Sequence, residues 1–166
     1  CGEAQALTDE LVRQADRLEN VEIVHMVAMG KAPYCQPGME KHFRHNALFV
    51  GGSTRKAVEE GRGDYTPCFF HEIPKLFTDG TLPVDVAFLQ LSEPDENGVC
   101  SYGVSVDYTQ PAAEAAKLVI AQINKNMPYT YGNGINLKDI DYIVEKDEPL
   151  IELQPPKIGE TEHKIG

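Results

Sequence analysis

The stretch Val84–Leu91 constrains the fold of this chain more than any other feature, because it is apolar at nearly every position. A strand that is apolar on both faces is typical of a parallel sheet covered by helices on both sides. A strand with one face in water would instead alternate apolar and polar residues. We therefore expect Val84–Leu91 to form a strand in the centre of a parallel sheet.

Patterns of strand and helix alternate along the rest of the chain. Further strands are expected at Val21–Met29, Ala47–Val50, Leu118–Ile123 and Tyr142–Val144, with a short extended piece at Arg62–Pro67. Helices are expected at Glu3–Leu18, Arg55–Glu60, Phe69–Phe77 and Gln110–Lys117. This alternation predicts right-handed crossovers and an α/β fold with an open, mostly parallel sheet and flanking helices. Such sheets bind their ligands beyond the carboxyl ends of the strands.

The composition fits one globular domain and excludes two classes of partner. The chain has 166 residues, of which 42% are hydrophobic and 25% are charged, a balance that allows a real core. Its net charge of -11 would repel the phosphates of a nucleic acid. No apolar run approaches the roughly 20 residues that span a bilayer, so we expect a soluble, cytoplasmic protein with no membrane partner. The spacing of its four cysteines suits neither a disulfide framework nor a metal site, so buried free thiols are expected.

Two polar loops lie where a sheet of this kind binds its ligands. Gly51-Gly52-Ser53 separates an expected strand from an expected helix. Its backbone N–H groups suit an anion as well as they suit a plain tight turn. Ser92–Gly98 follows the apolar strand and predicts either a ligand-binding loop or a turn with a short hairpin.

Two residue pairs suggest other chemistry. His42 and His45 have a spacing that chelates metals, but no third ligand is close in the sequence, so a solvated basic face is the expectation. Cys68 and His71 have the residue types of a thiolate and its base, which would need a geometry that sequence does not supply. Neither a metal site nor a cysteine hydrolase is therefore expected.

Longer blocks, distributed over nearly the whole chain, carry a family resemblance. They are Val21–Met26, Phe49–Gly52, Thr54–Arg55, Gly61–Pro67, Val84–Ala87, Ser92–Gly98, Gly103–Ser105, Asp107–Tyr108 and Ala115–Ala121. Together they resemble the acetyl-CoA hydrolase/transferase family, and within it the 4-hydroxybutyrate CoA-transferases. Colinear blocks of this length are more specific than any short motif.

That resemblance implies the N-terminal half of an acyl-CoA:carboxylate CoA-transferase, with the α/β fold of the CoA-transferase type. It assigns 1–153 to the half-domain, with the first strand missing, and 154–166 to a linker and the start of the second half. The missing initiator Met and the abrupt end at Gly166 lead to the same expectation of a longer protein. The nucleophilic glutamate of the family lies in the second half, so no catalytic residue is expected here and this chain alone should be inactive.

The resemblance also implies the substrates and partners. Coenzyme A is a substrate, exchanged between an acyl-CoA such as 4-hydroxybutyryl- or butyryl-CoA and acetate, and no permanently bound cofactor or metal is expected. The partners are the C-terminal half of the same protein and further copies in a homo-oligomer. Candidate pocket residues at the strand ends are Gly2, Glu3, Gly51, Gly52, Ser53, Ser92, Asp95, Ser101, Tyr102 and Gly103. Two alternatives stay open, namely an acyl-CoA hydrolase and a non-catalytic ligand-binding or assembly domain.

Overall fold

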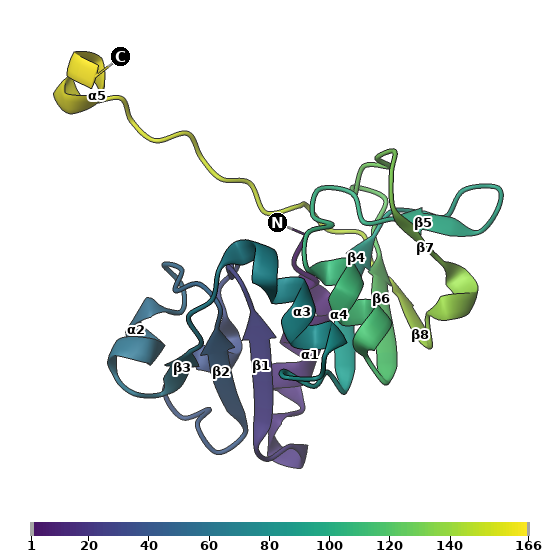
Figure 1. Ribbon diagram of the computed structural model, residues 1–166, viewed down its shortest axis with the longest axis horizontal. Helices are drawn as coiled ribbons and strands as arrows, with labels where there is room; N and C mark the ends of the chain where they lie inside the picture. The colour runs from purple at the N-terminus through teal and green to yellow at the C-terminus, as the bar shows by residue number, and fades with distance from the viewer. Residues whose placement is uncertain (1, 166) are drawn as a thin grey trace.

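The computed structural model describes residues 2–165 as two three-stranded parallel sheets with helices packed against them (Figure 1). The first sheet has the order β1-β2-β3, formed by Val21–His25, Phe43–Ala47 and Gly63–Tyr65. The second sheet has the order β4-β6-β8, formed by Val86–Leu91, Leu118–Ile123 and Tyr142–Glu145. These features confirm the predicted α/β class with mostly parallel strands.

A short antiparallel ribbon and five α-helices complete the structure. The ribbon pairs β5 (Val99–Ser101) with β7 (Gly134–Asn136). The helices are α1 (Gln5–Arg13), α2 (Arg55–Glu59), α3 (Ile73–Thr78), α4 (Thr109–Ala115) and α5 (Glu160–Ile165). Single 3₁₀ turns occur at Ala15–Arg17, Pro33–Cys35, Phe70–Glu72 and Leu137–Asp139. No helix within residues 2–165 is long and apolar enough to cross a membrane.

Three apolar clusters hold the layers together. One lies in the second sheet and includes Leu89, Leu91 and Ala121. A second packs β1 and β2 against α1 and α2, through residues such as Phe43 and Ala57. The third cluster joins the two sheets through α3 and α4, and its members include Val24, Leu48, Ile73, Phe77, Val84, Tyr108 and Ala112. The helices therefore pack across both sheets.

Two of the expected strands are placed differently in the structure. The predicted strand at Ala47–Val50 is wrong by several residues, because β2 occupies Phe43–Ala47. The sequence did not indicate a strand at this place, because Arg44, His45 and Asn46 are polar. The apolar stretch Val84–Leu91 contains β4 as expected, but β4 is an edge of its sheet and β6 is the central strand. An apolar pattern reports burial under helices, which an edge strand can share.

The three cysteines in the described part of the chain are free. Cys35 and Cys100 are buried and free as predicted, Cys68 is partly exposed, and Cys1 lies outside the described residues.

After β8 the chain runs in extended form to α5, away from the sheets (Figure 1). Leu153 on this extended segment is 78% exposed. Leu153 thus has little apolar cover within residues 2–165.

Two stacked histidines lie beneath α1 and α2 on the face of the first sheet. The rings of His25 and His45 are 4.2 Å apart, and His25 shares a hydrogen bond with the hydroxyl of Tyr34. His45 Nδ1 lies 3.0 Å from the carbonyl oxygen of Ile23. Burial lowers the pKa of His25 to about 3, with a further contribution from His45, and burial also lowers the pKa of His45. The pair is therefore neutral at pH 7, and the predicted solvated basic face at His42 and His45 is wrong for His45.

Acid should destabilise the fold through this pair. In the unfolded chain the imidazoles titrate near their ordinary pKa of about 6.5, so below that pH the unfolded state binds more protons and stability falls toward pH 3. One imidazole held neutral costs about 2 kcal/mol of unfolding free energy between pH 7 and pH 5. Urea unfolding of His25→Gln should lose that part of the pH dependence. The exposed control His163→Gln should keep it, and equal pH dependence in both variants would contradict the assignment.

Candidate functional site

The two sheets meet at the carboxyl ends of β1 and β4, where Glu3 contacts both. The N–H of Gly30, in the loop after β1, donates to Glu3 Oε2 over 3.0 Å. The side chain of Gln90 on β4 donates to the Glu3 carbonyl oxygen over 2.6 Å. One residue thus ties the loop of one sheet to a strand of the other, at the edge where α/β sheets bind ligands.

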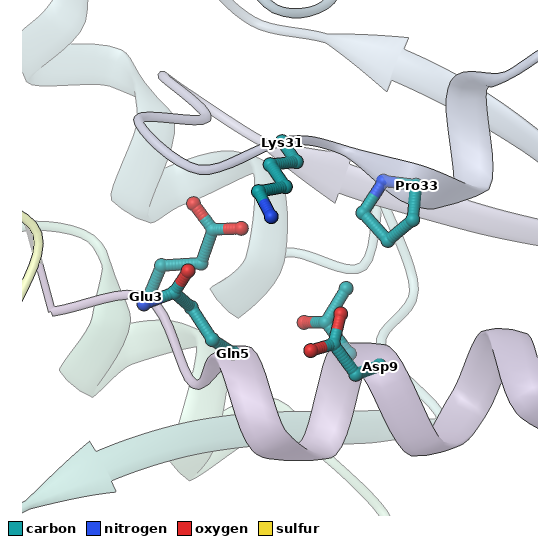
Figure 2. Close-up of a pocket in the computed structure, with 6 residues that line it drawn as sticks. Glu3, Gln5, Asp9, Lys31 and Pro33 are labelled. Atoms are coloured by element: carbon teal, nitrogen blue, oxygen red, sulfur yellow. The ribbon is translucent and has the colours of Figure 1, made fainter. Parts of the chain in front are cut away.

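A small pocket of about 90 Å³ opens beside Glu3 (Figure 2). Its lining residues come from the start of α1 and the loop after β1, and they are Glu3, Gln5, Thr8, Asp9, Lys31 and Pro33. In Figure 2 the side chains of Glu3 and Lys31 reach into the same space. Within residues 2–165, Lys31 Nζ forms no ion pair and Glu3 Oε1 accepts no hydrogen bond. The pocket therefore offers a small ligand both a donor and an acceptor.

A relay of buried amides continues from Glu3 to the point where the chain leaves the second sheet. Asn124, with 0% exposure, donates to Gln90 Oε1 over 2.7 Å and to the Glu148 carbonyl oxygen over 2.8 Å. Its own oxygen accepts from the N–H groups of Asn126 and Glu148. Every polar atom of this buried side chain is paired, as such groups require. The relay fixes β4 and the segments after β6 and β8 relative to Glu3.

The predicted residues of the Ser92–Gly103 region mainly hold their own loop. Ser92 Oγ accepts from the N–H of Ser101, and Ser101 Oγ accepts from the N–H groups of Gly103 and Thr130. Both serines are buried. Their hydroxyl groups are engaged in hydrogen bonds within this region, which agrees with the turn and hairpin interpretation.

Asp95 and Tyr102 are likewise part of the framework. The Asp95 carboxylate accepts from the N–H groups of Val99 and Asn97, and these bonds hold its pKa below the usual range. Tyr102 is buried in the core of the second sheet, and burial raises its pKa to about 12. The buried Tyr102 is therefore not available to a substrate, and the partly exposed Asp95 carboxylate is engaged by its own loop.

Two glycines allow the N-terminus and the loop after β6 to pack closely. Gly103 has φ of +62°, and a Cβ there would lie 2.2 Å from Met127 Sδ. A Cβ on Gly2 would lie 3.2 Å from Met127 Cε. The structure thus brings Gly2, Glu3 and Gly103 to one part of the carboxyl edge.

The Gly51-Gly52-Ser53 loop lies at the carboxyl edge of the first sheet. Ser53 Oγ donates to the Ala28 carbonyl oxygen over 2.8 Å, and a Cβ on Gly51 would touch Val27. The helix that follows, α2, has five residues. The hydroxyl is engaged and the helix is short, so the tight-turn interpretation is favoured over an anion site.

Neither alternative chemistry gains support from the geometry. Cys68 and His71 share no hydrogen bond within residues 2–165, and burial together with Glu72 raises the pKa of Cys68. His42 Nδ1 forms a hydrogen bond with the Leu18 carbonyl oxygen. No group of three potential metal ligands occurs in the described part of the chain.

A model of the acetyl-CoA hydrolase/transferase N-terminal domain matches residues 1–154. The chain belongs to the acetyl-CoA hydrolase/transferase family. The 4-hydroxybutyrate coenzyme A transferase of Clostridium kluyveri is 63% identical over 99% of this chain, which covers 39% of that relative. The butyryl-CoA:acetate CoA-transferase of Anaerostipes caccae is 31% identical over 88% of this chain, which covers 34% of it.

A solved structure agrees with this placement in the acetyl-CoA hydrolase/transferase family. The crystal structure of a 4-hydroxybutyrate CoA-transferase from Porphyromonas gingivalis matches 94% of this chain with a TM-score of 0.75 and 37% identity. This chain covers 36% of that structure. It therefore spans between one third and two fifths of the length of these family members.

Sequence reasoning missed several residues of the edge. Lys31 and Asp9 line the pocket, and Gln90 and Asn124 form the relay. A signal for the relay was present, because Gln90, Gln122 and Asn124 interrupt or follow two otherwise apolar strands. A polar residue in such a strand must be buried with a partner. Lys31 carried no comparable signal.

The relay yields a stability prediction. Asn124→Ala should leave the N–H of Glu148 and the oxygen of Gln90 without their partner, which costs about 2 kcal/mol of unfolding free energy. The exposed Asn126 also donates to the Glu148 carbonyl oxygen, and its replacement by Ala should cost about 0.5 kcal/mol or less. Urea unfolding of both variants measures the difference. Equal losses would show that the relay has no special role.

Proposed function

We propose that the protein containing this chain is a CoA-transferase that exchanges CoA between 4-hydroxybutyryl- or butyryl-CoA and acetate. The observation that carries the proposal is the 63% identity to the Clostridium kluyveri 4-hydroxybutyrate coenzyme A transferase over nearly the whole chain. The Anaerostipes caccae relative is a butyryl-CoA:acetate CoA-transferase, which supports acetate as the acceptor. We further propose that the protein is located in the cytoplasm, takes part in fermentative acid metabolism and forms a homo-oligomer.

The proposed reaction uses a glutamate of the second half as the nucleophile. Its carboxylate attacks the thioester carbonyl, the C–S bond breaks, and CoA leaves as the thiolate, so that a mixed anhydride of the glutamate and the acyl group remains. The thiolate then attacks the glutamyl carbonyl, which releases the first carboxylate and forms a glutamyl-CoA thioester. Acetate attacks this thioester, and the reverse steps give acetyl-CoA and free glutamate. Covalent catalysis thus divides one difficult exchange into easier steps.

The two buried thiols of this half are poor candidates for the nucleophile. Burial raises the pKa of Cys35 and of Cys100 to about 11, so both thiols are protonated at neutral pH. A protonated thiol is a poor nucleophile. In the proposed enzyme, this half supplies walls of the pocket through its strand-end loops, including Gly2, Glu3 and Gly51-Gly52-Ser53.

The pocket beside Glu3 is our candidate for the part of the acyl group that carries the 4-hydroxyl. Lys31 Nζ donates a hydrogen bond to the hydroxyl oxygen, and the free Glu3 Oε1 accepts a hydrogen bond from the hydroxyl group. A donor and an acceptor placed on a substrate hydroxyl favour the substrate that carries it over the analogue that lacks it. Butyryl-CoA would therefore gain nothing from Lys31.

Lys31→Met in the full-length protein tests this assignment. We expect kcat/KM for 4-hydroxybutyryl-CoA to fall about tenfold, while kcat/KM for butyryl-CoA changes little, since one lost hydrogen bond is worth about 1.4 kcal/mol. Steady-state kinetics with both substrates gives the ratio. Lys125→Met serves as the control, because Lys125 lies in a different pocket, with Glu93, Glu145 and Asp147. An unchanged ratio in Lys31→Met would remove the pocket from the site.

The activity itself is tested by acetate dependence. The full-length protein should convert butyryl-CoA and acetate to acetyl-CoA and butyrate, and the 166-residue chain alone should not, because it lacks the proposed nucleophile. Product analysis with and without acetate separates transfer from hydrolysis. Acetate-independent release of free CoA would favour the hydrolase, and turnover by the 166-residue chain would overturn the proposed location of the nucleophile.

A further inference from the structure

Residues 26–32 connect β1 to the 3₁₀ turn at Pro33–Cys35 and carry the groups that face Glu3. The N–H of Gly30 donates to Glu3 Oε2, and Lys31 lines the pocket beside Glu3. The position of Lys31 decides where a ligand in this pocket finds a hydrogen-bond donor. That position depends on how the connecting segment is held.

Ala32, directly after Lys31, has a backbone conformation that alanine rarely adopts. Its φ is +45° and its ψ is +60°, in the left-handed region. The Cβ atom makes this region unfavourable for residues other than glycine, and the proline that follows favours an extended backbone instead. Ala32 is 0% exposed, so its surroundings hold it in this conformation. Backbone strain of this kind is often found at functional sites.

A buried hydrogen bond joins the two ends of the segment. His25 Nε2, at the end of β1, shares a hydrogen bond with the hydroxyl of Tyr34. The ring of His25 is stacked on His45, and Tyr34 is 4% exposed. The N–H of Cys35 donates to the Ala32 carbonyl oxygen over 3.0 Å. The bond between His25 and Tyr34 therefore ties the end of a strand to the turn that contacts Ala32.

Other contacts fix the first part of the segment. Ser53 Oγ donates to the Ala28 carbonyl oxygen over 2.8 Å, and the Tyr108 hydroxyl accepts from the N–H of Met26 over 3.2 Å. Both contacts lie three or more residues before Lys31 in the sequence. The part that contains Lys31 depends instead on the 3₁₀ turn and on the bond that holds this turn.

The hydroxyl of Tyr34 stays protonated at neutral pH. Burial raises the pKa of Tyr34, and the negative charge of Glu3 contributes further. A protonated phenol can share a hydrogen bond with an imidazole nitrogen. The bond to His25 therefore persists under the conditions in which the pocket would bind its ligand.

We propose that His25 and Tyr34 are positioning residues for the pocket beside Glu3. Their hydrogen bond holds Ala32 in the left-handed conformation, and this conformation directs Lys31 toward Glu3. Neither side chain lines the pocket, so the pair acts through Lys31. The inference rests on the proposed use of this pocket for the 4-hydroxyl of the acyl group. It makes the preference for 4-hydroxybutyryl-CoA over butyryl-CoA depend on two residues outside the pocket.

Tyr34→Phe in the full-length protein removes the hydrogen bond and keeps the ring. The ratio of kcat/KM for 4-hydroxybutyryl-CoA to kcat/KM for butyryl-CoA should fall about threefold, since a misplaced Lys31 donor binds the hydroxyl less well. The Gly30 amide should exchange faster with solvent, because its bond to Glu3 is held less firmly. Tyr142→Phe is the matched control and should change neither quantity, since Tyr142 is 61% exposed on β8.

Ala32→Gly separates positioning from a general loss of stability. Glycine adopts positive φ readily, so the segment no longer needs the hydrogen bond to keep this conformation. Tyr34→Phe combined with Ala32→Gly should therefore recover most of the kinetic ratio and the slow exchange of Gly30. A mere packing defect at Tyr34 would not be corrected in this way, because Ala32→Gly removes a further methyl group from the same apolar cluster.

The kinetic ratio decides the proposal. An unchanged ratio in Tyr34→Phe overturns it, and so does a double variant that recovers no part of the ratio. His25→Leu removes the other partner of the bond and should lower the ratio as Tyr34→Phe does. If Lys31→Met lowers the ratio and Tyr34→Phe does not, the proposed function stands and the positioning role fails. If the full-length protein transfers no CoA, the proposed function fails, and unchanged Gly30 exchange in Tyr34→Phe would then overturn the positioning role by itself.

Discussion

The hydrogen bonds that converge on Glu3 are the constraint on which the strand-end edge depends. Within residues 2–165 the two sheets share no strand, so their alignment rests on the helix layer and on Glu3, which bonds to Gly30 and Gln90. Asn124 extends the contact to Glu148, where the chain leaves the second sheet. Glu3 and Glu148 are therefore connected through Gln90 and Asn124, next to the pocket that Glu3 lines.

Local patterns predicted the strands and helices whose signals lie in their own residues. Leu118–Ile123 forms β6 as expected, and the helix predicted at Arg55–Glu60 is α2 almost to the residue. β2 was misplaced because its polar residues are stabilised by non-local pairing, for example between Asn46 and Glu22. The ribbon of β5 and β7 was not predicted, because Gly134–Asn136 is short and pairs with a strand far away in the sequence.

The site was predictable at the level of loops but less so at the level of side chains. The sequence placed Gly51-Gly52-Ser53 and Ser92–Gly103 at strand ends, where the structure also has them. The sequence could not show that the hydroxyl groups of Ser92 and Ser101 form hydrogen bonds inside this region, since such bonds depend on three-dimensional packing. Lys31 was missed because a single lysine after a strand has no distinctive pattern. Family resemblance, by contrast, was readable over the whole chain.

In the proposed enzyme, this chain supplies walls of the CoA-transferase site and the nucleophile lies beyond Gly166. The most direct measurement is mass spectrometry of the full-length protein after brief incubation with butyryl-CoA in the absence of acetate. We expect a covalent CoA adduct on a glutamate that follows residue 166 in the sequence. An adduct on any residue between Cys1 and Gly166, such as Cys68, would contradict it.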